Sequence, residues 1–176
     1  MSQGEFLTRL TIWLALGGAA LGAVLQFAFR SNARWQGLAR WAWTGGCLSL
    51  LAHVACAYHF YHAWSQDSVY RETARQTAEV FNLNWGGGVY VNYAFMAVWL
   101  VDVLWWWRGL AVYERRPRAW AWAWQSFFLF IVFNATVVFK TGMQRWLGLA
   151  ICIGLAVIWW RLSQPSMFAN SKGIKA

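Results

Sequence analysis

All three histidines of the chain fall in one short segment, as His53, His59 and His62. His59 and His62 are three residues apart, so on a helix they lie side by side on one face. Neutral imidazole nitrogens are common metal ligands, and the carboxylate of Glu72 is a candidate third ligand. His59, His62 and Glu72 therefore predict a site for a transition metal such as zinc, copper or iron.

Haem fits these histidines less well than a single metal ion does. Its two axial ligands usually come from different helices, whereas all the histidines here share one segment. A third interpretation is structural, with histidines that line a polar seam or lie at the interfacial end of a membrane helix.

Further polar residues interrupt the apolar stretches of the sequence, and such residues are costly in lipid and are candidates for function. At about 1.5 Å per helical residue, Asn92 and Asn134 lie at nearly the same depth as His59. Tyr93 lies beside them and His53 lies deeper. His53, Asn92, Tyr93 and Asn134 thus predict a small-ligand site.

Asp102 is the only acidic residue inside an apolar stretch. In lipid it must be protonated, hydrogen-bonded or paired with a cation. The candidate partners are Gln125, Arg40, Arg108 and the N–H group of a tryptophan. Two roles stay open for Asp102: a polar contact that joins two spans, or proton or ion handling together with His53.

The composition places the chain among membrane proteins. Of its 176 residues, 60% are hydrophobic and 12% are charged, whereas a soluble domain carries about a quarter charged residues. The net charge of +9 does not predict nucleic-acid binding, because no soluble segment combines a basic run with aromatic residues.

Five apolar stretches are each long enough to cross a hydrocarbon core of about 30 Å as a helix. They cover approximately residues 10–29, 38–63, 86–107, 119–139 and 146–162. Because backbone groups in lipid must be satisfied internally, we expect an all-α membrane protein with five transmembrane helices in one bundle. This single domain covers residues 1–163, and 164–176 is expected to be a flexible cytoplasmic tail.

The distribution of Lys and Arg predicts the orientation in the membrane. Ten of the 15 lie in the first and third connections and at the C-terminal side, which indicates a cytoplasmic C-terminus and an outer N-terminus. We expect a multi-pass protein of a cell membrane, such as the bacterial inner membrane. Tryptophans near the span ends, including Trp43, Trp106, Trp124 and Trp159, predict an aromatic belt at the headgroups.

The connection between the second and third stretches carries a helical pattern. Tyr70, Ala74, Thr77 and Phe81 share one face of a helix over about 68–81. We expect a short amphipathic helix on the outer side, either resting on headgroups or acting as a lid over a site. The glycines at 86–88 that follow predict a tight turn with close backbone approach.

Small residues predict a closely packed seam between the first two spans. The first span contains Gly18 and Gly22, and small side chains allow helices to approach closely in lipid. In the second span, His59 continues a series of small residues, so we expect His59 to point into a seam between helices. The series is Gly45, Ser49, Ala52, Cys56 and Ala63.

The sequence identifies no reaction and no catalytic residue. Our leading hypothesis is an outward-facing polar His/Asn site that binds a metal or a small ligand and serves redox chemistry. The alternatives are a non-catalytic subunit or assembly factor of a larger membrane complex, and a proton- or ion-coupled carrier that uses Asp102 and His53. Expected partners are the lipid bilayer and other membrane subunits or further copies of the chain, not nucleic acid.

Overall fold

The structure is a computed structural model that describes residues 2–29, 32–139 and 142–163, and it contains helices but no strands in these ranges. The elements are α1 (Gln3–Ala28), α2 (Ala33–Tyr61), α3 (Gln66–Phe81), α4 (Gly88–Trp107), α5 (Leu110–Glu114), α6 (Arg118–Phe133), the π-helical turn η1 (Asn134–Val138) and α7 (Met143–Ser163). Each of the five apolar stretches lies in a helix. The predicted tail lies outside the described residues.

Within the residues that the structure describes, three helical segments are long and apolar enough to cross a membrane. They are Gln3–Gln26, Gly88–Trp107 and Arg118–Val138. Helix α2 is less apolar than these segments, because it carries Arg34, Arg40 and His53 among other polar residues. The molecule is therefore a helical membrane protein with at least these three candidate spans, and five spans remain a prediction.

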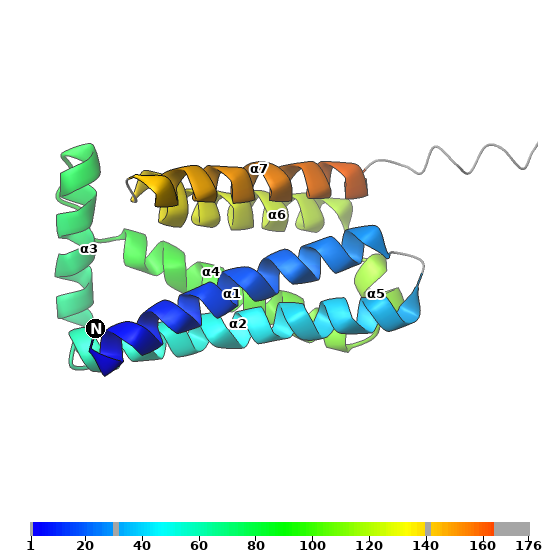
Figure 1. The fold of residues 1–176 in the computed structure, drawn as a ribbon, viewed down its shortest axis with the longest axis horizontal. Coiled ribbons are helices and arrows are strands. Elements are labelled where there is room, and N and C mark those ends of the chain that lie inside the picture. The colour runs from blue at the N-terminus through cyan, green and yellow to red at the C-terminus, as the bar shows by residue number, and fades with distance from the viewer. Residues whose placement is uncertain (1, 30–31, 140–141, 164–176) are drawn as a thin grey trace, which may run out of the picture.

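The long helices run alongside one another, and the short elements lie at opposite ends of the bundle (Figure 1). Helix α3 lies across the end that also holds the N-terminus, whereas α5 lies at the other end. The predicted helix over 68–81 is thus present as α3, two residues longer at its start. Helix α5 was not predicted from the sequence.

Helix α1 begins seven residues before the predicted span. Ser2 caps it, because the Ser2 hydroxyl accepts a hydrogen bond from the backbone N–H of Glu5. Glu5 in turn pairs with Arg9 at 2.7 Å. The first turns of α1 are therefore a polar extension of the apolar helix.

Glycines bring the backbones of α1 and α2 into close contact. A Cβ atom on Gly18 would lie 2.8 Å from the carbonyl oxygen of Ala42 and from backbone atoms of Gly46. A Cβ on Gly22 would lie 3.2 Å from the Ala39 carbonyl oxygen. The predicted use of Gly18 and Gly22 is confirmed.

The α2 face of this seam was predicted incorrectly. Gly45 faces open space and Ala52 is exposed, whereas Gly46 packs against α1. His59 belongs to the exposed side of α2 and does not point into the seam. The reason is that small residues occur on several faces of α2, and only the partner helix determines which of them is used.

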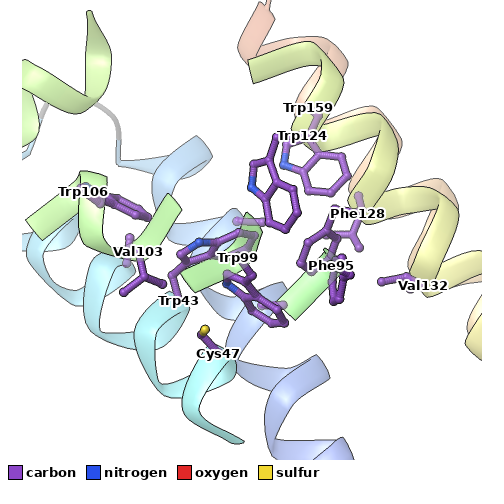
Figure 2. Close-up of a cluster of buried hydrophobic side chains, with 14 of the residues drawn as sticks. Trp43, Cys47, Phe95, Trp99, Val103, Trp106, Trp124, Phe128, Val132 and Trp159 are labelled. Atoms are coloured by element: carbon purple, nitrogen blue, oxygen red, sulfur yellow. The ribbon is translucent and has the colours of Figure 1, made fainter. Parts of the chain in front are cut away.

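The core is a cluster of aromatic rings from α2, α4, α6 and α7 (Figure 2). Phe128 is 1% exposed and lies at its centre. Five ring centroids lie between 5.1 and 5.5 Å from that of Phe128, those of Trp43, Phe95, Trp99, Trp124 and Trp159. Aromatic pairs at such distances add stabilisation beyond the area that they bury.

This core corrects the predicted position of several tryptophans. Trp43, Trp106, Trp124 and Trp159 are buried inside the bundle and do not form an interfacial belt. The position of a tryptophan along a helix gives its depth in the membrane but not whether its ring points into the bundle or towards lipid. The prediction used depth alone and therefore assigned inward-facing indoles to the interface. Trp41, Trp107, Trp122 and Trp160 at the same end are exposed.

Candidate functional site

Helix α3 is held at both ends and along its inner face. Ser65 caps its start by accepting a hydrogen bond from the Ser68 N–H at 3.3 Å, and Asn82 ends it in the left-handed conformation, with φ of 54°. Of the four residues predicted to share one face, Ala74 and Thr77 are buried and Tyr70 is half-buried, whereas Phe81 is exposed.

The glycine loop that follows α3 packs against that helix. A Cβ on Gly86 would lie 2.3 Å from the Tyr70 carbonyl oxygen, so no other residue fits there without movement of the backbone. This contact confirms the predicted close backbone approach at the start of α4. It also fixes the distance between α3 and the bundle.

A polar groove of about 650 Å³ opens between the end of α2 and the outer face of α3. Its lining contains hydroxyl, imidazole, amide, carboxylate and guanidinium groups. The lining residues are Tyr61, His62, Ser68, Arg71, Glu72, Arg75 and Gln76. His62 Nδ1 lies 3.0 Å from the Ser68 hydroxyl, so the imidazole has a defined orientation across the two elements.

The charges in the polar groove are arranged as pairs along α3. Arg75 donates two hydrogen bonds to Glu72, from Nη2 at 2.6 Å and from Nε at 3.0 Å, and also bonds Glu79. Gln76 donates to the same Glu72 carboxylate at 2.8 Å. The hydrogen bonds from Arg75 lower the pKa of Glu72 from its ordinary value. Glu72 is therefore an anion at neutral pH.

A second polar cluster joins three helices at the same end. The hydroxyl groups of Tyr58 in α2 and Tyr93 in α4 meet, and both contact Gln66 at the start of α3. Tyr93 donates to Gln66 Oε1 at 2.7 Å. Tyr93 thus takes part in docking α3 onto the bundle.

The histidines separate into three environments. His62 lines the polar groove. The exposed His59 ring packs against Phe60 and Trp64, with centroids 4.7 and 6.4 Å away. His53 Nδ1 donates to the Thr8 carbonyl oxygen of α1 at 2.9 Å. The three rings do not converge on one point.

The predicted asparagines do not reach the polar groove. Asn92 is exposed on α4. Asn134 donates to the Phe130 carbonyl oxygen of its own helix at 2.8 Å, next to the π-helical turn. The equal depth of Asn92, Asn134 and His59 therefore does not bring these side chains into contact, because they point in different directions.

The polar groove offers few protein ligands for a metal ion. Among residues 2–29, 32–139 and 142–163, no three His, Cys, Asp or Glu side chains come close enough to form a metal site. His62 and Glu72 are the two of the proposed ligands that share the groove. A metal there would take its remaining ligands from water or from a bound molecule.

Asp102 lies in a separate buried site near the α5 end of the bundle. It is 0% exposed. Its Oδ1 accepts from Arg116 Nη1 at 2.6 Å, and its Oδ2 accepts from the Tyr113 hydroxyl at 3.0 Å and from Trp43 Nε1 at 3.1 Å. The predicted tryptophan N–H partner is confirmed.

The cationic partner of Asp102 is Arg116, which the sequence did not predict. Gly109, with φ of +121°, turns the chain back after α4, and this turn brings α5 and Arg116 against α4. The Arg116 guanidinium also lies 3.8 Å above the Tyr113 ring. The predicted candidate Arg40 instead stacks on Trp107 at 4.2 Å.

Tyr113 completes the Asp102 site as a neutral donor. Its ring stacks on Trp106 with centroids 4.5 Å apart. Burial raises the pKa of Tyr113, and the nearby Asp102 carboxylate raises it further. The hydroxyl therefore keeps its proton and continues to donate to Asp102.

Comparisons of this chain with protein-family models, with curated proteins and with solved structures found no match.

Proposed function

We propose that the protein is a five-span membrane protein that binds a small polar ligand in the groove between α2 and α3. In this proposal the N-terminus and α3 face the outside, and the α5 end faces the cytoplasm. The uneven distribution of Lys and Arg supports that orientation. The three long apolar segments support insertion into a membrane.

The observation that carries this proposal is the lining of the polar groove. Donors and acceptors from two separate elements meet there, namely His62 of the α2 C-cap and Ser68, Glu72 and Arg75 of α3. Binding sites typically combine a concave shape with a few convergent polar groups. Because the guanidinium and carboxylate groups lie together, a ligand that carries both an amine and an acid group matches the groove.

A metal is the second candidate for the same groove. His62 and Glu72 could supply an imidazole nitrogen and a carboxylate oxygen, which suits zinc, copper or iron. Glu72 is already bound by Arg75 and Gln76, however, and would have to exchange these partners for the metal. Arg71 and Arg75 are also paired, with Asp67 and with Glu72 and Glu79, but each guanidinium has five N–H groups, so an organic acid can bind the N–H groups that these pairs leave over.

Native mass spectrometry of the protein in mild detergent tests the proposal, together with elemental analysis for iron, copper and zinc. The groove variant is His62→Ala with Glu72→Gln. The matched control is His59→Ala with Glu79→Gln, which changes the same residue types outside the groove lining. We expect a small-molecule adduct on the wild-type chain and on the control, and its loss from the groove variant.

The outcomes separate the candidates. If a near-stoichiometric metal were found and were lost only from the groove variant, the groove would be a metal site and not a site for an organic ligand. An adduct that persists in the groove variant, or the absence of any adduct and metal, would count against the proposal.

In this proposal Asp102 has a structural role and does not carry ions. Both of its oxygens are occupied by donors, and the side chain is fully buried. A carrier residue has to exchange its proton or ion with water on each side of the membrane. The three donors around Asp102 would have to release it at every cycle.

A further inference from the structure

The arginines at the two ends of the bundle differ in their partners. At the α3 end, Arg9 pairs with Glu5 at 2.7 Å, Arg71 pairs with Asp67 at 2.6 Å, and Arg75 pairs with Glu72 and Glu79. Arg145 at this end forms no salt bridge among the described residues and donates to the Val137 carbonyl oxygen at 2.9 Å. At the α5 end, six arginines form no salt bridge within the described part of the chain. They are Arg34, Arg40, Arg108, Arg115, Arg118 and Arg161.

These six residues, here called the arginine end, come from elements that meet in space. They belong to the first turns of α2, the segment around α5, the start of α6 and the end of α7, and Figure 1 places these at the end opposite α3. Two carboxylates of the described residues lie in this part of the chain, Asp102 and Glu114, and Asp102 is already held by Arg116. The arginine end is therefore strongly cationic.

Exposed tryptophans lie among these arginines. Trp41 is 62% exposed and Trp160 is 55% exposed, and Trp107 and Trp122 are also exposed. Indole rings on the surface of a membrane protein prefer the headgroup level. The arginine end therefore lies at the depth where lipid phosphates occur.

One of these arginines is already oriented by an indole ring. The Arg40 guanidinium lies 4.2 Å above the ring of Trp107, whose Nε1 donates to Thr44 at 3.0 Å. Arg40 Nε is buried and has no acceptor among the described residues. A guanidinium stacked in this way can still donate to a phosphate, because its N–H groups lie in the plane of the group and its face contacts the ring.

We infer that the arginine end binds the phosphate groups of anionic phospholipids. Guanidinium groups bind phosphate oxygens with paired, charge-assisted hydrogen bonds. Lipid is favoured over an acidic protein partner because the unpaired arginines alternate with exposed tryptophans, a combination that suits the interface and its negative surface charge. The inference depends on membrane insertion and is independent of the polar groove.

The test compares two variants with equal loss of charge. Arg108 and Arg115 are changed to Gln in one variant. Arg9 and Arg145, which lie outside the lining of the polar groove, are changed to Gln in the control. Native mass spectrometry of protein released from bilayers of phosphatidylcholine and phosphatidylglycerol then counts the lipids retained by each. We expect the wild-type chain and the control to retain phosphatidylglycerol at least about fivefold over phosphatidylcholine, and the arginine-end variant to lose this preference.

A second measurement on the wild-type chain does not depend on the folding of any variant. Raising the ionic strength from about 0.01 to 1 M shortens the Debye length from about 30 to 3 Å. The preference for phosphatidylglycerol should fall accordingly. Equal retention of both lipids by the wild-type chain, or equal loss of preference in both variants, would overturn the inference. So would a preference that is unchanged by salt.

Discussion

Arg116 donates a 2.6 Å hydrogen bond to Asp102 although the two residues lie on opposite sides of the chain reversal at Gly109. The pair is nearly water-free, since the Asp102 side chain is 0% exposed and that of Arg116 is 11% exposed. Two further donors, Tyr113 and Trp43, complete the coordination of the carboxylate. The contact between Asp102 and Arg116 therefore ties α5 and the start of α6 to the centre of the bundle.

Removing either partner of this pair should destabilise the fold. We expect Asp102→Asn to lower the free energy of unfolding by about 3 kcal/mol, because it leaves a buried guanidinium without its counter-charge. The exposed neighbour provides the control, since Arg115→Gln should change little. Thermal unfolding in detergent, followed by circular dichroism, measures both. If Asp102→Asn and Arg115→Gln unfolded at the same temperature, the result would contradict a structural role for the Asp102–Arg116 pair.

The α1–α2 contact should be sensitive to a single methyl group. Gly18→Ala places a Cβ 2.8 Å from backbone atoms of α2, and such overpacking costs about 1–3 kcal/mol. Gly17→Ala is the matched control, because a Cβ at Gly17 meets no atom within 4 Å. Unfolding temperatures of the two variants make the comparison. Equal unfolding temperatures for Gly18→Ala and Gly17→Ala would show that α1 and α2 can move apart without loss of stability.

The docking of α3 should depend on Gly86. In Gly86→Ala the new Cβ would lie 2.3 Å from the Tyr70 carbonyl oxygen, so α3 must move away from the loop. We expect faster amide hydrogen exchange over residues 66–81 in this variant. Gly88→Ala, whose Cβ would lie 3.4 Å from Thr73 Cγ2, should exchange like the wild-type chain. Unchanged exchange in Gly86→Ala would mean that the loop adapts and α3 does not.

The pH dependence of α3 should follow from Glu72. Its pKa in the folded chain lies below the unfolded value, because Arg75 hydrogen-bonds the ionised form. The pairing therefore stabilises the folded chain fully above the unfolded pKa of about 4.3 and is lost as the pH falls through the lower, folded value. Solvent exposure keeps the effect small.

The direct readout of this pairing is the titration of the Glu72 carboxyl carbon by NMR. Arg75→Gln should raise the pKa of Glu72 towards its ordinary value. Arg71→Gln provides the control, because Arg71 pairs with Asp67 and not with Glu72. A Glu72 titration that is the same in the wild-type chain and in Arg75→Gln would exclude Arg75 as the cause of the lowered pKa.

Much of the helical framework could be predicted because its signals are local. Apolar stretches located the five long helices, and the spacing of Tyr70, Ala74, Thr77 and Phe81 located α3. The glycines at 86–88 and the Gly18–Gly22 pair also predicted close approaches that the structure contains. In each case the residues that carry the signal are the residues that make the contact.

The remaining contacts depend on direction, which the spacing of residues along one helix does not give. Arg116 follows a reversal at Gly109, so no helical periodicity relates it to Asp102. His59 and His62 are neighbours on α2, yet the helix ends between them, and only His62 turns towards α3. The buried Trp43 and the exposed Trp41 differ by two residues and face opposite environments.

The contact between Gly18 and Gly46 has a consequence for the evolution of this chain. A side chain at either position would meet backbone atoms of the other helix, and backbone cannot be trimmed by a compensating substitution. The two positions therefore cannot drift independently while the helices keep this separation. Distant relatives that retain the fold should carry glycine at both sites even after most of their other residues have diverged, so this pair provides a signature for recognising them.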